Sequence, residues 1–308
     1  MIILFTSSGM NLIMANIRNI DLEHGLPARH ITTILQDSKG FLWFGTTHGL
    51  VKYNGTSNKI FKPADLKNST LSNHIKSIYE DTNQKLWICT KSGIASYDYS
   101  KDELYAEPMQ FPEESSAYGH SFSISQDHTG VYWVAYNGTI MQLDTARKVM
   151  EPYQYKNHHL NHIRSVSYFY LDHNDAFWAI SPGMGLYLKT TNDSFRRYSP
   201  ASILGEKAFD IVYQFEQLDE NEYLLATRTG LLLAKYHHKE LYYETIYKSE
   251  IFSSTAFTVT ENSIYFLTRN EIIAIDRNNF SKMQSLTHLF NPEKNIEFTG
   301  ISKSKDGS

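Results

Sequence analysis

Apolar and polar positions alternate along this chain in runs that recur as a unit. The first unit reads ITTILQDSKGFLWFGTTHGLVKYNG from Ile31, the second IKSIYEDTNQKLWICTKSGIASYD from Ile75, and the third FSISQDHTGVYWVAYNGTIMQLD from Phe122. In each, an alternating run leads to an Asp and a turn, then to an aromatic-centred run and a third run. Alternation with period two between tight turns predicts three antiparallel strands per unit. The segment from Asp37 to Gly40 suits a hairpin turn, because Asp bonds its own backbone and Gly accepts positive φ.

All four tryptophans mark the period of this repeat. Trp43, Trp87, Trp133 and Trp178 follow one another at spacings of 44, 46 and 45 residues. A further extended run, such as residues 57–61, supplies a fourth, outer strand to each unit. Four short strands recurring at this period, with an aromatic residue in the second strand, are typical of a β-propeller blade. The sequence therefore predicts an all-β toroid of four-stranded blades.

The repeat decays toward the C-terminus. Leu224 replaces the Trp in the fifth unit, and Tyr265 replaces it in the sixth. A seventh unit begins at Thr299 and stops after its first strand, while residues 16–21 offer an outer strand for the closing blade. We expect a seven-bladed β-propeller with six complete blades and a partial seventh, formed as one domain by residues 16–308 and truncated within its last blade.

Composition narrows the possibilities. The formal net charge of −4 and the pI of about 6.3 give no indication of nucleic-acid binding. No apolar run is long enough to span a membrane. A single cysteine, Cys89, excludes an internal disulfide, and its place in the slot of Gly45 indicates a small buried thiol rather than a nucleophile. Residues 1–15, MIILFTSSGMNLIMA, resemble a secretory signal without its basic start; the alternative is a frayed apolar tail.

The Asp and Trp of the repeat predict structural roles. A catalytic carboxylate would not be needed in four successive units, so we expect the Asp to form turns and tie blades together. The Trp residues are expected to pack between adjacent blades, with the indole N–H paired to a backbone carbonyl. The structural set is Asp37, Trp43, Asp81, Trp87, Asp127, Trp133, Asp172 and Trp178.

Histidines recur just before the innermost strand of successive units. His30, His74 and His120 each lie seven residues ahead of the turn Asp, at the mouth of the expected central channel. Imidazoles there would bind a metal, hydrogen-bond a polar ligand, or cap turns. Blades of a seven-fold ring are rotated by about 51°, which leaves equivalent side chains ~10 Å apart, whereas zinc ligands lie ~2 Å from the metal. We therefore expect no metal and no cofactor.

Cations form the second candidate set. Lys91, Arg228 and Arg269 directly follow the Thr that ends the second strand, and His48 lies one step further in the first unit. These turns belong to the same expected face as the histidines. Cations that converge there would attract an anion, and Arg grips a carboxylate or sulfate through two hydrogen bonds. The alternative is a set of solvated turn residues. The chain has none of the common hydrolase, metalloprotease or nucleotide-binding motifs.

The repeats resemble a known family. Residues 25–55, GLPARHITTILQDSKGFLWFGTTHGLVKYNG, and the second copy, TLSNHIKSIYEDTNQKLWICTKSGIASYD, resemble two-component regulator propellers. These form the extracytoplasmic sensor region of hybrid histidine kinases of Bacteroidetes. The resemblance implies a periplasmic location, an oligosaccharide ligand, a homodimeric receptor, and a membrane helix and kinase that follow the propeller and regulate transcription. It carries over no ligand-binding residue.

We therefore expect a non-catalytic sensor propeller that recognises a glycan or another polar, acidic ligand. One alternative is a scaffold that binds a protein partner or feeds a different output, such as a diguanylate cyclase. A second alternative is a propeller lyase or hydrolase whose acid and base come from facing loops.

Overall fold

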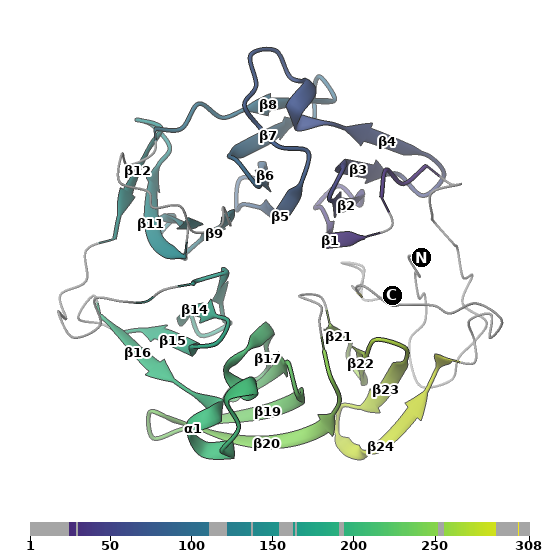
Figure 1. The fold of residues 1–308 in the computed structure, drawn as a ribbon, viewed down its shortest axis with the longest axis vertical. Coiled ribbons are helices and arrows are strands. Elements are labelled where there is room, and N and C mark those ends of the chain that lie inside the picture. Colours follow the sequence, from purple (N-terminus) through teal and green to yellow (C-terminus); the bar gives the residue numbers. More distant parts are fainter. Residues whose placement is uncertain are drawn as a thin grey trace.

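The protein is an all-β propeller in the part of the chain that the computed structural model describes, residues 25–28, 30–110, 122–136, 138–153, 163, 165–190, 194–251, 256–287 and 301. Six antiparallel four-stranded sheets follow one another around a ring, each with its strands in sequence order from the innermost to the outermost (Figure 1). The four-stranded blades confirm the predicted fold class. The segments expected to complete a seventh blade, residues 16–21 and the run from Thr299, lie outside the described residues apart from Ile301, as do residues 1–15.

The blades have the following bounds. The first three are β1 (Ile31–Gln36), β2 (Leu42–Thr46), β3 (Gly49–Tyr53) and β4 (Asn58–Phe61); β5 (Ile75–Glu80), β6 (Leu86–Thr90), β7 (Ile94–Asp98) and β8 (Glu103–Ala106); and β9 (Phe122–Gln126), β10 (Tyr132–Tyr136), β11 (Thr139–Asp144) and β12 (Val149–Pro152). The next three are β13 (Tyr168–Leu171), β14 (Phe177–Ser181), β15 (Gly185–Lys189) and β16 (Phe195–Tyr198); β17 (Val212–Asp219), β18 (Glu222–Thr227), β19 (Gly230–His237) and β20 (Glu240–Lys248); and β21 (Phe257–Val259), β22 (Ser263–Leu267), β23 (Ile272–Asp276) and β24 (Asn279–Ser285). Short helices are η1 (Pro63–Asp65), α1 (Pro200–Leu204) and η3 (Lys207–Asp210).

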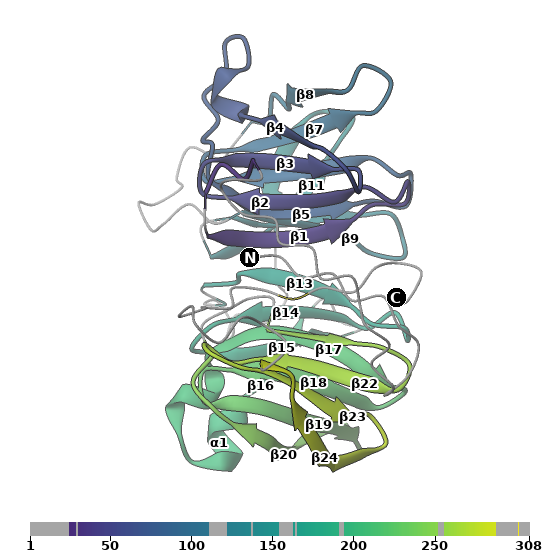
Figure 2. The same cartoon turned by 90° about the vertical axis from the view of Figure 1, so that its right-hand side faces the viewer.

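The strands of every blade run between the same two faces of the disc (Figure 2). One face carries the turns between the first and second strands, where the repeated Asp lies, and we call it the Asp face. The opposite face carries the residues that precede each innermost strand and the turns between the second and third strands; we call it the His face. In the first blade, β1 pairs antiparallel with β2, so that Ile31 lies opposite Thr46 at the His face.

The hydrophobic core lies between blades rather than within one of them. Each major cluster of buried side chains combines residues from two successive blades. Trp43 packs against Ile78 and Leu86 of the second blade in such a cluster. Burial of these broad apolar faces is the main favourable contribution to the association of neighbouring blades.

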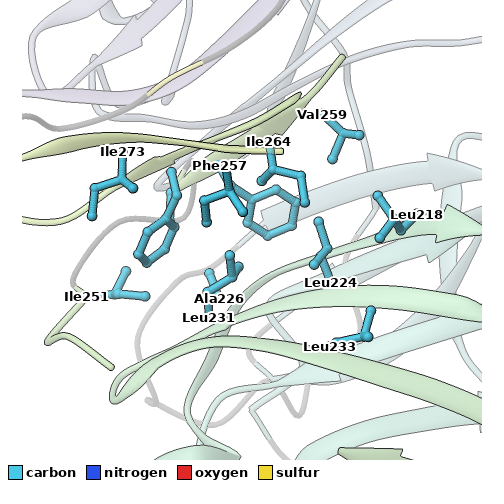
Figure 3. Packing of buried hydrophobic residues seen from close by; sticks show 13 residues of the cluster. Leu218, Leu224, Ala226, Leu231, Leu233, Ile251, Phe257, Val259, Ile264 and Ile273 are labelled. Atoms are coloured by element: carbon cyan, nitrogen blue, oxygen red, sulfur yellow. The ribbon is translucent and has the colours of Figure 1, made fainter. Parts of the chain in front are cut away.

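The contact between the fifth and sixth blades is apolar where other contacts contain a Trp. Leu224 stands in the Trp position and packs with Leu233, Phe257 and Ile264 (Figure 3). The side chain of Gln214 donates to the Phe257 carbonyl at 2.9 Å and accepts from the Phe257 N–H at 3.0 Å. Apolar packing of Leu224 with Phe257 and Ile264 therefore takes the place of a Trp at this contact, and the Gln214 hydrogen bonds add a polar link between the two blades.

Candidate functional site

The repeated Asp organises the Asp face through three hydrogen bonds within its own blade. In the first blade, Asp37 Oδ1 accepts the backbone N–H groups of Lys39 and Phe41, both at 2.9 Å, and Oδ2 accepts the indole N–H of Trp43 at 2.7 Å. The same three bonds recur at Asp81, Asp127 and Asp172. The expectation that each Trp N–H pairs with a backbone carbonyl is wrong: the carboxylate takes that bond, because the hairpin brings it beside the ring.

A tyrosine from the next blade completes this arrangement at three contacts. The hydroxyl groups of Tyr99, Tyr132 and Tyr223 donate to Asp37, Asp81 and Asp172 at 2.7, 2.6 and 2.7 Å, respectively. These tyrosines were not predicted, although the sequence carries a signal for two of them: Tyr132 directly precedes a Trp, and Tyr223 directly precedes Leu224 in the Trp position. The carboxylates of Asp37, Asp81 and Asp172 therefore link neighbouring blades.

Asp127 departs from this pattern. Phe177 stands where Tyr132 and Tyr223 stand in their blades, and it has no hydroxyl to donate. The Thr129 hydroxyl donates to Asp127 Oδ1 at 2.6 Å instead. Burial alone would raise the pKa of Asp127, but hydrogen bonds from Thr129 and Trp133 outweigh it and hold the pKa below its ordinary value.

On the His face, the structure brings together candidate residues from the first two blades. His30 is exposed directly before β1, and His74 is partly buried directly before β5. The Lys91 N–H donates to the His74 carbonyl at 2.9 Å, which places the turn after β6 beside the start of β5. His48 is exposed in the turn after β2, where its Nδ1 lies 2.8 Å from the Thr47 hydroxyl. His120 lies outside the described residues.

Electrostatics shows that these groups act on one another. Burial lowers the pKa of His74, and the positive charges of Lys76, Lys91, His30 and His48 lower it further. Burial and then Lys91 likewise lower the pKa of Lys76. The sequence analysis missed Lys76 because it falls inside a predicted strand. The register of β5 against β6 is interrupted between Ile75 and Ser77, and Lys76 is the residue at this bulge.

The other predicted cations lie on distant blades. Arg228 is exposed after β18, and its N–H donates to the Ile211 carbonyl at 2.9 Å, as Lys91 does to His74. Arg269 is exposed after β22 in the sixth blade. Lys91 therefore belongs to the group around His74, whereas Arg228 and Arg269 lie on the fifth and sixth blades.

Other candidate chemistry is limited in the described segments. No group of three or more His, Cys, Asp or Glu side chains is placed there to hold a metal ion. Cys89 is fully buried, and burial raises the pKa of its thiol to about 12, so it is a poor nucleophile. No helix in the described part of the chain is long and apolar enough to cross a bilayer.

The fold and the repeated Asp–Trp hairpin define a β-propeller whose blades are joined by buried carboxylates. The sequence model for the two-component regulator propeller family matches residues 25–48 and 70–92, which include the Asp turns and Trp positions of the first two blades. The chain carries repeats of the two-component regulator propeller family. No curated protein matches the sequence.

Solved structures share the fold. The extracellular domain of BT3049 of B. thetaiotaomicron, described as a hybrid two-component system, has a TM-score of 0.71 and 18% identity over 92% of this chain. The extracellular domain of BT4673 from the same organism has a TM-score of 0.68 and 20% identity over 88% of it. PorZ of the type-IX secretion system of Porphyromonas gingivalis has a TM-score of 0.54 and 15% identity over 84% of it. The chain spans 38%, 36% and 33% of these proteins, respectively.

Proposed function

We propose that this chain is part of the extracytoplasmic sensor region of a two-component signalling protein and that it binds its signal without catalysis. The match of its first two blades to two-component regulator propeller repeats carries this proposal. Two structural neighbours described as extracellular domains of bacterial signalling systems support it. Those neighbours are longer than this chain, which is consistent with a protein that has further domains. A seventh blade would close the ring.

The signal we propose is an oligosaccharide or another polar ligand, bound at the His face in the periplasm. Side chains on the Asp face are used in contacts between blades, as the buried carboxylates of Asp37 and Asp81 illustrate. Loops on the His face carry exposed His and Lys side chains that are available to a ligand. Binding would regulate transcription only through a difference in affinity between two arrangements of a receptor homodimer.

A ligand screen tests this function. We would measure the thermal unfolding of the complete ectodomain with neutral and acidic oligosaccharides, and repeat it with Lys91, Arg228 and Arg269 changed to Ala. A ligand that binds only the native state raises the unfolding temperature. Stabilisation by an oligosaccharide is the expected result. Stabilisation by no sugar would refute the proposed ligand class and favour a protein partner, and turnover of an acidic polysaccharide would refute the non-catalytic assignment.

A further inference from the structure

A cluster of positive side chains lies where the first two blades meet on the His face. Its members are His30, His48, His74, Lys76 and Lys91. Among the described residues, no carboxylate pairs with either lysine of the cluster. Elsewhere in the same blades, Lys52, Lys59 and Lys85 each contact a carboxylate at 2.9, 2.6 and 2.6 Å. Lys76 and Lys91 differ from these three lysines in having no carboxylate partner among the described residues.

Backbone geometry brings His74, Lys76 and Lys91 together and places the start of β1 beside them. In the second blade, Ile75 lies opposite Thr90 in the β5–β6 pairing, so His74 and Lys91 are neighbours across it. The Thr32 hydroxyl of the first blade donates to the Ile75 carbonyl at 2.8 Å. Because Ile75 lies between His74 and Lys76 in the sequence, this bond joins the start of β1 to the middle of the cluster.

The other blades with comparable backbone geometry lack this group of side chains. The innermost strands β1 and β17 have the same register interruption as β5, at which Thr32 and Tyr213 stand in place of Lys76. In the fifth blade, the residue beside Arg228 is Ile211 rather than a histidine. The combination of Lys76, Lys91 and His74 thus occurs in the second blade, although the first and fifth blades share parts of its backbone geometry.

We propose that this cluster is an anion-binding site that takes a carboxylate or sulfate group. Two ammonium groups and up to three imidazolium groups supply charge-assisted donors to such an anion. Lys76 and His74 are partly buried, where charge interacts more strongly than in bulk water. The site makes the proposed function more specific, since an acidic sugar would place its charged group here. It also stands independently as a site for a small anion.

Anion binding at this site is coupled to proton uptake. The surrounding positive groups, Lys76 and Lys91 of the second blade and His30 and His48 of the first, disfavour a proton on His74. An anion among them reverses this effect and raises the pKa of His74. Affinity for the anion therefore increases as the pH falls from about 7.5 to about 5.5, the range in which imidazole gains its proton.

Histidine NMR of the 308-residue chain tests the site. The imidazole resonances would be followed against pH with sodium sulfate, sodium glucuronate or glucose at constant ionic strength, with His74 assigned through His74→Asn. We expect both anions, but not glucose, to raise the pKa of His74. Lys76→Gln and Lys91→Gln should each weaken sulfate binding ~3- to 10-fold, because each removes one nearby charge. Lys282→Gln, on the exposed outer strand β24, is the charge-matched control and should change nothing.

Two results would overturn the site: no response of His74 to either anion, or an equal loss of affinity in Lys282→Gln. Circular dichroism of each variant excludes unfolding as the cause, and the two lysine variants serve as independent tests. Sulfate without glucuronate binding would indicate a site for inorganic anions rather than for a sugar acid. Oligosaccharide stabilisation of the ectodomain without an anion effect at His74 would leave the sensor function intact and remove this site alone.

Discussion

Replacement of Asp81 by Asn tests whether the buried carboxylates hold the blades together. Asp81 accepts the backbone N–H groups of Asn83 and Lys85 at 2.9 Å, the indole N–H of Trp87 at 2.9 Å, and the hydroxyl of Tyr132 at 2.6 Å. Asn has the same shape but only one acceptor oxygen, because its second polar atom is a donor. Two of the four donors therefore lose their partner in a side-chain site that is 5% exposed.

The expected cost follows from these contacts. A buried donor without a partner costs about 1–3 kcal/mol, so Asp81→Asn should lower the free energy of unfolding by about 3 kcal/mol. Tyr132→Phe removes one donor and leaves the other three bonds, and should cost about 1.5 kcal/mol, the lower range for a hydrogen bond to a charged group. If the Asn oxygen accepts the two backbone N–H groups of the turn, the double variant Asp81→Asn with Tyr132→Phe leaves only the Trp87 N–H without an acceptor. Its cost should be smaller than the sum by about 1 kcal/mol.

Urea unfolding followed by tryptophan fluorescence and circular dichroism measures these differences. Asp219→Asn is the matched control, because Asp219 ends the equivalent strand of the fifth blade but is exposed, and among the described residues its side chain bonds the adjacent Glu220 N–H alone. It should cost less than about 0.5 kcal/mol. The reasoning would be refuted if Asp81→Asn behaved like Asp219→Asn, or if the Asp81 and Tyr132 effects were additive.

Four further predictions follow from local geometry. Phe177→Tyr should stabilise the fold by about 1 kcal/mol in urea unfolding by supplying the missing donor to Asp127; no gain would show that the hydroxyl cannot reach it. Gln84→Gly should stabilise by about 0.5–1 kcal/mol, because Gln84 has φ of 63°; destabilisation in the same assay would contradict this. Native Cys89 should resist iodoacetamide until urea unfolds the chain; rapid alkylation would refute its burial. Stability should fall as the pH drops below 6.5, because His74 has its ordinary pKa in the unfolded chain, which therefore binds more protons than the folded chain. A His74→Asn variant whose stability depends on pH in the same way as that of the unmodified chain would contradict this contribution.

The blade architecture was readable from the sequence because its determinants are local. Trp43 and Trp87 each mark one blade. The turn at Asp37 spans four residues, and the Gly40 N–H donates to the Asp37 carbonyl at 3.1 Å to close it. Strand alternation and turn chemistry act over a few residues, so a single copy suffices to predict them. The partner of each Trp N–H was missed because the prediction considered backbone acceptors and overlooked a carboxylate six residues earlier.

Contacts between blades were harder to predict because they join residues far apart in the chain. Tyr99 reaches Asp37 from the end of the third strand of the next blade, whereas Tyr132 reaches Asp81 from the second strand. The same bond thus comes from two sequence positions, and no fixed spacing finds both. Lys76 was missed for a related reason: a bulge depends on strand pairing, which the alternation of β5 does not reveal.

Cationic side chains on the His face gather where one repeat differs in sequence from the others. The turn position after the second strand carries Lys91, Arg228 and Arg269 on the second, fifth and sixth blades, so the ring keeps these three residues apart. A local cluster therefore requires neighbouring blades to contribute different side chains at different positions. Lys76, at the bulge of β5, does this beside the repeated histidines His30 and His74. Under the proposed function, ligand specificity would consequently arise where an additional residue such as Lys76 joins the repeated residues of the His face.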